Sequence, residues 1–167
     1  LICIILLFIW FLFFSWINIS QGSPGILYEK DGIYEKIIVK DASWNNKPAR
    51  LLILDASHSS AMYLDSDELA FDYTKYYELY KLFNSNPAYA FFIGGGAYSM
   101  PKDILNKNPD IIVDVTEIEP ELFVLAKKYF GLSDVDRLNN YIEDGRRFLT
   151  EHNNAYDVIV SDVYYSI

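Results

Sequence analysis

The chain has 167 residues, of which 51% are hydrophobic, and a formal net charge of −9 at pH 7. This length and composition suit a folded domain with a core, and they exclude a disordered chain and a typical nucleic-acid-binding protein. An acidic surface repels polyanions and favours cationic ligands, although the same charge also serves solubility. Cys3 is the only cysteine, so no intrachain disulfide forms, which agrees with a reducing compartment.

Residues 1–17 are apolar except for Ser15. At 1.5 Å per residue, a helix of this length crosses most of a hydrocarbon core of roughly 30 Å. We therefore predict that residues 1–20 are the end of a transmembrane helix whose beginning lies upstream, with a signal peptide as the alternative. No Lys or Arg precedes Lys30, so the positive-inside rule gives no orientation. We expect a membrane protein with its soluble domain in the cytoplasm.

Residues 21–66 are predicted to form a linker followed by a small antiparallel β subdomain. The β-rich runs 26–30 and 33–40 flank Asp31-Gly32, which is a strong hairpin signal. A second turn at 45–48 is followed by two further runs, 50–54 and 61–64, which favour another pair of strands.

Residues 67–83 change to a helical period and predict an amphipathic α-helix, capped by Ser66 or Asp67. The tyrosines of its apolar face either form the wall of a pocket for an alkylammonium ligand or simply pack on the sheet. The residues of that face are Leu69, Tyr73, Tyr76, Tyr80 and Phe83.

From residue 67 to the end of the chain, we predict an α/β domain of Rossmann-like type. The expected strands are 89–93, 111–117, 138–142 and 157–162, and the expected helices are 100–106, 120–129 and 146–152. Alternation of this kind indicates a parallel sheet whose ligand lies beyond the carboxyl ends of the strands. The last strand is followed by only five residues and would be an open edge, so we expect the chain to be a fragment at both ends.

The first of these strands ends in Gly94-Gly95-Gly96, and the second ends at Glu117. A strand, a glycine turn, a helix and an acid about 20 residues on is typical of a dinucleotide- or nucleoside-binding unit. The glycines do not follow the G-x-G-x-x-G pattern, so a ligand without phosphates is favoured over NAD. This points to an adenosyl-sulfonium compound.

The third and fourth strands end in Glu143-Asp144-Gly145 and Ser161-Asp162. A single acid at a strand end is often a helix cap, which is the plain interpretation of Asp144 taken alone. Acids on three neighbouring strand ends beside a glycine loop indicate one shared site. We then expect Glu117 to hold ribose hydroxyls, Asp144 to accept from an adenine amino group, and Asp162 to meet the reacting group. The two histidines lack partners at metal-ligand spacing, so no metal is predicted.

Taken together, these segments resemble the spermidine synthase family, which comprises polyamine aminopropyltransferases on a methyltransferase-type Rossmann fold. The resemblance covers about residues 28–166, and it lies in segments 36–39, 54–55, 65–68, 93–96, 116–120, 126–130, 143–146 and 156–162. It implies that Glu117 binds the ribose, and Asp144 the adenine, of decarboxylated S-adenosylmethionine or methylthioadenosine. It also implies that Asp162 orients and deprotonates the attacking amine. The β subdomain is a family feature, and some prokaryotic members are fused to membrane helices.

The chain departs from the family pattern at four places. Ala97-Tyr98 follow the glycines where the family has an acid that holds the donor's amino group, and Tyr165 replaces a second aspartate. Met62 replaces a glutamine, and Phe71-Asp72 replace a tyrosine-histidine pair. The remaining candidates to hold the distal ammonium of the amine are Asp55, Asp65 and Asp72, with Tyr73 beside them.

Three functions follow from these observations. The first is aminopropyl transfer from decarboxylated S-adenosylmethionine to a small amine such as putrescine. The second is methyl transfer from S-adenosylmethionine, and the third is a non-catalytic adenosyl-binding module on a membrane protein. In each case the nucleoside is a co-substrate or ligand and not a permanent cofactor. The expected partners are a small amine and a membrane, with a second copy of the chain as a candidate and nucleic acid excluded.

Overall fold

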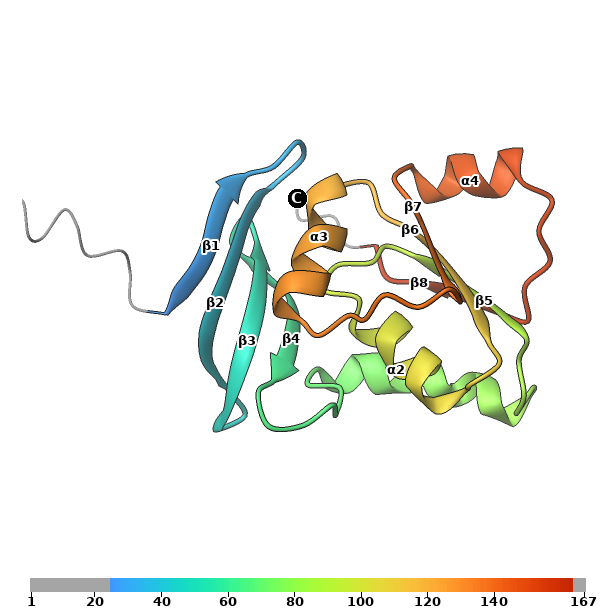
Figure 1. The fold of residues 1–167 in the computed structure, drawn as a ribbon, viewed down its shortest axis with the longest axis horizontal. Helices are drawn as coiled ribbons and strands as arrows, with labels where there is room; N and C mark the ends of the chain where they lie inside the picture. Colours follow the sequence, from blue (N-terminus) through green and yellow to red (C-terminus); the bar gives the residue numbers. More distant parts are fainter. Residues whose placement is uncertain (1–24, 164–167) are drawn as a thin grey trace, which may run out of the picture.

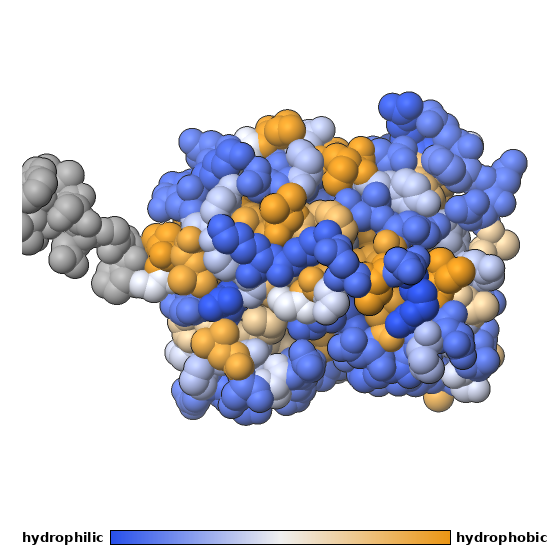
Figure 2. All heavy atoms as spheres, in the orientation of Figure 1, coloured by the Kyte–Doolittle hydropathy of each residue, from blue (hydrophilic) through white to orange (hydrophobic). Residues whose placement is uncertain are grey.

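The computed structural model describes residues 25–163, which form two four-stranded sheets lying side by side (Figure 1). Within this range, no helix is both long enough and apolar enough to cross a membrane. The predicted transmembrane segment at 1–20 and Tyr165 lie outside the described residues. The surface seen in Figure 2 is mostly hydrophilic, with separate apolar patches.

The first sheet is antiparallel, as predicted, with the order β1-β2-β3-β4. Its strands are β1 (Ile26–Asp31), β2 (Lys36–Trp44), β3 (Lys47–Leu54) and β4 (Ser57–Tyr63). Asn45 and Asn46 have φ angles of 49° and 61°, and they connect Trp44 directly to its partner Lys47. Such a two-residue turn matches the right-handed twist of the strands, and asparagine tolerates this backbone conformation better than most residues do.

The second sheet is parallel and has the order β7-β6-β5-β8, which confirms the predicted α/β class. Its strands are β5 (Tyr89–Ile93), β6 (Ile112–Thr116), β7 (Leu138–Tyr141) and β8 (Val158–Ser161). The helices are α2 (Ser99–Lys107), α3 (Pro120–Tyr129) and α4 (Gly145–Glu151). Each of these elements lies within two residues of its predicted bounds.

The predicted amphipathic α-helix at 67–83 is wrong in type, start and buried face. The chain forms a 3₁₀ helix, η1 (Asp72–Leu82), which Phe71 precedes without a side-chain cap. Leu69 lies before the helix and bridges to Met62, whereas Phe83 is 92% exposed. A 3₁₀ helix has three residues per turn, so the inward row is Thr74, Tyr77 and Tyr80. An α-helical period of 3.6 assigns a different set of residues to that face.

The two sheets are joined through α3. Arg50 on β3 pairs with Asp41 through two hydrogen bonds of 2.7 and 3.1 Å, and it also donates to the Tyr129 carbonyl at 2.9 Å. Lys102 on α2 donates to the Phe130 carbonyl at 3.1 Å. Both cations therefore lie at the carboxyl end of α3, where the helix dipole favours positive charge.

Candidate functional site

The four parallel strands end at the same level. Ile93 is in register with Thr116 and Ser161, and Thr116 is in register with Tyr141. The next residues continue this alignment, because Gly94 N donates to the Thr116 carbonyl and Asp162 N donates to the Ile93 carbonyl, each at 2.9 Å. The glycine loop, Glu117 and Asp162 thus start from one edge of the sheet, as predicted.

Glu117 and the glycine loop form one hydrogen-bonded unit. The Glu117 side chain is buried, and its Oε2 accepts from Gly95 N at 2.8 Å and from Gly96 N at 3.0 Å. Its Oε1 accepts from Glu119 N at 2.9 Å. Three amides therefore stabilise the carboxylate, and hydrogen bonds to a charged acceptor are the stronger kind. The arrangement holds a negative charge at the tip of β6, beside the loop.

Two of the three glycines are required by close packing. Gly94 has a φ of 89°, and a Cβ there would lie 2.7 Å from the Asp162 carbonyl oxygen. At Gly95 a Cβ would lie 2.5 Å from two ring carbons of Tyr98. The loop therefore runs against Asp162 on one side and against the buried Tyr98 ring on the other.

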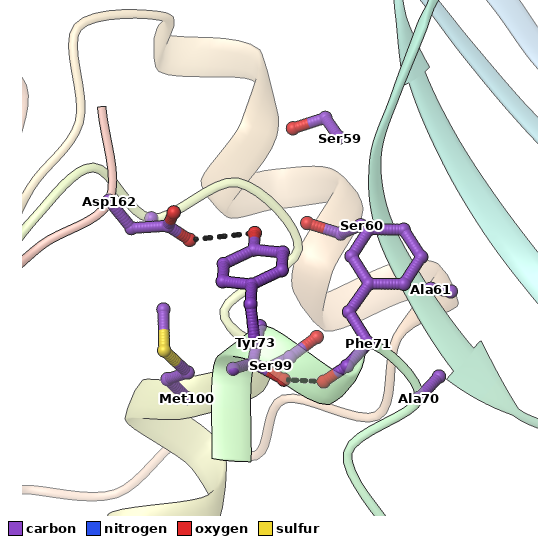
Figure 3. A pocket seen from close by; sticks show the side chains of 11 residues that line it. Ser59, Ser60, Ala61, Ala70, Phe71, Tyr73, Ser99, Met100 and Asp162 are labelled. Carbon is purple, nitrogen blue, oxygen red and sulfur yellow. Dashed lines mark hydrogen bonds between the residues drawn. The ribbon is translucent and has the colours of Figure 1, made fainter. Parts of the chain in front are cut away.

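A hollow opens beside this loop, between β4, η1 and the start of α2 (Figure 3). Asp162 points across it toward Tyr73, whose hydroxyl donates to Asp162 Oδ2 at 3.3 Å. The volume of the hollow is about 20 Å³, which is on the order of the space that one water molecule needs, ~10–15 Å³. The eleven lining residues are Ser59, Ser60, Ala61, Ala70, Phe71, Tyr73, Thr74, Gly95, Ser99, Met100 and Asp162.

Asp162 and Tyr73 shift each other's titration. Burial raises the pKa of the Asp162 carboxyl, and the hydrogen bond from Tyr73 opposes that rise. Burial, together with the charge of Asp162, raises the pKa of Tyr73 to about 12. A carboxylate with a raised pKa is a better proton acceptor than an ordinary aspartate, which suits a general base.

Asp144 and Gly145 serve helix α4 in this structure. Asp144 is exposed, and its Oδ1 accepts from Arg147 N at 3.0 Å, which is a helix cap. Gly145 is buried, and a Cβ there would collide with the Ile93 side chain. These contacts match the plain interpretation of Asp144 as a cap, and its adenine-binding role stays a prediction.

The three aspartates predicted to hold a distal ammonium do not line the hollow. Asp55 lies in the turn between β3 and β4, where its Oδ1 accepts from Lys36 N at 2.9 Å. Asp72 pairs with Lys75 at 3.3 Å, and Asp65 is exposed. Of the four candidate amine-binding residues, only Tyr73 is part of the lining.

Serine hydroxyls of the site were missed by sequence reasoning. Ser59 and Ser60 on β4 and Ser99 at the start of α2 line the hollow, and Ser60 Oγ accepts from Ala97 N at 3.2 Å. Met62, assigned to a family glutamine position, instead lies with its sulfur 3.7 Å from Lys102 Nζ. The serine run at 57–60 was the available signal, but short polar runs of this kind are common in turns.

The departure after the glycines has a packing reason. Ala97 is buried and packs in a cluster with Ile37, Val39 and Leu52 of the antiparallel sheet. A carboxylate at this position would be placed among apolar side chains without a partner, which is costly. Tyr98 is fully buried, and its hydroxyl donates to Asn140 on β7. The segment therefore belongs to the core and not to the wall of the hollow.

The tip of the first hairpin also reaches this region. Glu119 Oε2 accepts from Ile33 N at 2.6 Å and from Tyr34 N at 3.2 Å. The nearby Glu35 has a raised pKa, first because it is partly buried and then because Asp55, Glu117 and Glu119 lie close. The antiparallel sheet thus contributes to the charge environment of Glu117.

Comparison with known proteins places the chain near two kinds of transferase. It is 30% identical over 152 residues to a polyamine aminopropyltransferase of Methanocaldococcus jannaschii, a match covering 87% of this chain. It is 33% identical over 88 residues, or 50% of this chain, to the eEF1A lysine and N-terminal methyltransferase of Bos taurus. A probable spermidine synthase from Corynebacterium glutamicum superposes with a TM-score of 0.71 at 21% identity, over 84% of this chain and 53% of that one. No protein-family model matches the chain.

These similarities differ in extent. The match spans about half the length of the archaeal relative, 49%, and 13% of the bovine relative. The structural similarity shows that this chain shares the fold of about half of that probable spermidine synthase. The sequence similarity supports a relationship to the polyamine aminopropyltransferases.

Proposed function

We propose that this chain is a transferase that moves an alkyl group from an adenosyl-sulfonium donor to an amine. Its reaction is aminopropyl transfer from decarboxylated S-adenosylmethionine to a small amine such as putrescine. The observation that supports this most is the position of Gly95, whose amide donates to Glu117 Oε2 and which lines the hollow together with Asp162. A donor lying along the loop would have its ribose near Glu117 and its sulfonium toward Asp162.

In this reaction the lone pair of a neutral amine attacks the aminopropyl carbon attached to sulfur. The carbon–sulfur bond breaks, its electron pair stays on sulfur, and neutral methylthioadenosine leaves. The amine nitrogen gains a positive charge and gives one proton to Asp162. The raised pKa of Asp162 favours its role as proton acceptor, and Tyr73 orients the carboxylate through its hydrogen bond.

The extent of the sequence match favours aminopropyl transfer over other chemistry. The archaeal aminopropyltransferase aligns with 87% of the chain, whereas the bovine methyltransferase aligns with 50%. The hollow lies between the two sheets, with Ser59 and Ser60 from the antiparallel sheet and Gly95 from the loop of the parallel one. The extra sheet is therefore part of the proposed acceptor site.

Methyl transfer from S-adenosylmethionine is the second candidate. It is favoured by the packing of Ala97, which leaves an apolar side chain where an aminopropyltransferase would place an acid against the donor's amino group. The shared chemistry is nucleophilic attack by an amine on a carbon next to sulfonium, and the two reactions differ in which carbon is attacked.

The test is to incubate the full chain with putrescine and each donor in turn, and to identify products by mass spectrometry. Spermidine with methylthioadenosine supports aminopropyl transfer, whereas a methylated amine with S-adenosylhomocysteine supports the second candidate. Asp162→Asn should lower the rate by a factor on the order of 10²–10⁴ and leave methylthioadenosine binding intact. The control Asp134→Asn removes an exposed carboxylate far from the loop in sequence, and it should leave the rate unchanged. Nucleoside binding without any product would instead support a non-catalytic module.

We also propose that residues 1–20 attach the protein to a membrane with the α/β domain on the cytoplasmic side. The proposal rests on the apolar run at 1–17. Carbonate extraction of membranes containing the full chain tests it, because an integral segment stays in the membrane pellet. Protease treatment of sealed vesicles then reports the side on which the domain lies.

A further inference from the structure

Among the residues that the structure describes, the lining of the hollow contains one carboxylate, which belongs to Asp162. In the proposed reaction Asp162 faces the attacking nitrogen, so a second ammonium group on the acceptor would need another carboxylate. The rest of the lining is neutral and consists of serine, threonine and tyrosine hydroxyls, a glycine, and the apolar side chains of Ala61, Ala70, Phe71 and Met100. A second charge buried there would have no partner, which is costly.

The acids closest to this lining along the chain are bound elsewhere. Asp67 lies 3.3 Å from Lys102, and Glu68 lies 3.0 Å from Lys75. Glu117, which borders the glycine loop, accepts from three backbone amides. None of these three carboxylates lines the hollow. The site therefore matches an acceptor with a single cationic nitrogen.

A β-bulge turns two consecutive serines toward the hollow. Side chains alternate between the two faces of a regular strand, so neighbouring residues rarely share one site. In the pairing of β4 with β3, the register shifts between His58 and Ser60, and Ser59 is the extra residue. Bulges redirect side chains in this way and are common beside active sites.

Both serine hydroxyls lie on the side of the glycine loop. A Cβ built at Gly96 would lie 3.0 Å from Ser60 Oγ and 3.8 Å from Ser59 Oγ. Figure 3 shows the two side chains directed away from β4, toward the side of the hollow where Asp162 lies. Ser60 Oγ accepts from Ala97 N at 3.2 Å, so it can also donate its own O–H.

We propose that the acceptor is a primary amine whose far end is uncharged and carries a hydroxyl group. A serine hydroxyl both donates and accepts, so Ser59 and Ser60 can bind another hydroxyl in either sense. An ammonium group only donates, and its desolvation beside Phe71 costs more than two neutral oxygens return. The proposal rests on the proposed function, because it identifies the acceptor of that reaction.

The charge of the whole chain acts in the opposite direction. A net charge of −9 attracts a dication more strongly than a monocation. This attraction acts over long distances and is screened by salt, with a Debye length of about 8 Å at about 0.15 M. At that salt concentration the contacts inside the hollow decide which acceptor is preferred.

The test compares three acceptors with the same four-carbon chain. They are 4-amino-1-butanol, putrescine and butylamine, whose far ends carry a hydroxyl group, an ammonium group and no polar group. The full chain is assayed at about 0.15 M salt with the donor that supports turnover. We expect kcat/KM for the alcohol to exceed that for putrescine by about tenfold or more.

Substitutions in β4 test the place of the far end. Ser59→Ala should lower kcat/KM for 4-amino-1-butanol toward the value for butylamine. Ser59→Asp adds a second carboxylate to the lining, so it should raise kcat/KM for putrescine relative to the alcohol by about tenfold. Ser57→Asp is the matched control, because it adds the same charge to the same strand outside the lining, and it should leave the preference unchanged. Circular dichroism should show that all three variants are folded.

The outcomes separate this proposal from the proposed function. A chain that uses putrescine as well as the alcohol, or better, would refute the uncharged acceptor and leave the transfer reaction in place. A Ser59→Asp variant that changes the preference no more than Ser57→Asp does would refute the contact with the serine pair. Transfer to none of the three amines would refute the proposed function, and the acceptor assignment with it.

Discussion

Replacing Gly95 with alanine tests whether the glycine loop is determined by packing. The added Cβ would lie 2.5 Å from Cε2 and Cζ of Tyr98 and 2.9 Å from its hydroxyl oxygen. The Tyr98 ring is fully buried, contacts Phe123 with ring centroids 5.3 Å apart, and donates to Asn140, so it has little room to turn. Overpacking of this kind typically costs about 1–3 kcal/mol. The φ of Gly95 lies outside the left-handed region, so the cost is steric.

Urea unfolding of the full chain, wild type and variant, measures this cost. The background variant Tyr98→Leu shortens the clashing side chain, so Gly95→Ala should cost at least about 1 kcal/mol less there than in the wild type. Gly131→Ala is a control for backbone conformation alone, because Gly131 has a φ of 68° and its added Cβ would meet only Lys102 Nζ, at 3.7 Å. A Gly95→Ala protein within about 0.5 kcal/mol of wild type, or an equal cost in both backgrounds, would refute the packing argument.

Three further predictions concern Glu117 and Tyr73. Glu117→Gln removes the charge that the Gly95 and Gly96 amides face, so methylthioadenosine should bind about tenfold or more weakly by calorimetry; equal affinity would contradict the assigned role. Tyr73→Phe removes the hydrogen bond that lowers the pKa of Asp162, so the acidic limb of the pH–rate profile should move to higher pH, and an unmoved limb would remove Asp162 as the titrating base. The pKa of Tyr73 is raised from 10.0 to about 12, so the folded state holds this proton more tightly than the unfolded state does. The contribution of Tyr73 to stability is therefore complete below pH 10 and is lost as pH rises toward 12. The urea midpoints measured at pH 9 and at pH 11 should thus differ less from each other in Tyr73→Phe than they do in wild type.

The parallel sheet and its loop could be predicted because their local signals agree with their tertiary roles. Strands β5, β6 and β8 formed on largely apolar runs, and Glu119-Pro120 began α3 at the predicted residue. The first hairpin was predicted at Asp31-Gly32, and its second strand begins later, at Lys36, because residues 32–35 form the turn. Glu117 after β6 and Asp162 after β8 could be expected at one edge, since parallel strands end at the same edge of a sheet.

The failures involve properties that a linear pattern does not contain. Helix η1 has three residues per turn instead of 3.6. Its tyrosine pairs 73/76 and 77/80 are three residues apart, a spacing that fits both kinds of helix over a short stretch. The hollow takes Ser59 and Ser60 from a strand 34 residues or more before the loop, a juxtaposition that only the packing of the two sheets creates. Asp144 and Asp55 resemble site residues by type, but they accept hydrogen bonds from the backbone amides of Arg147 and Lys36.

Glu119 gives the antiparallel sheet an electrostatic role as well as a structural one. This buried carboxylate accepts from two backbone amides of the first hairpin, and it lies two residues from Glu117. A shortened protein that begins at residue 67 would lose those two donors and leave the Glu119 carboxylate less well stabilised beside Glu117. Truncation should therefore disturb the surroundings of Glu117 as well as uncover Ala97 and the α3 side chains that pack on the antiparallel sheet.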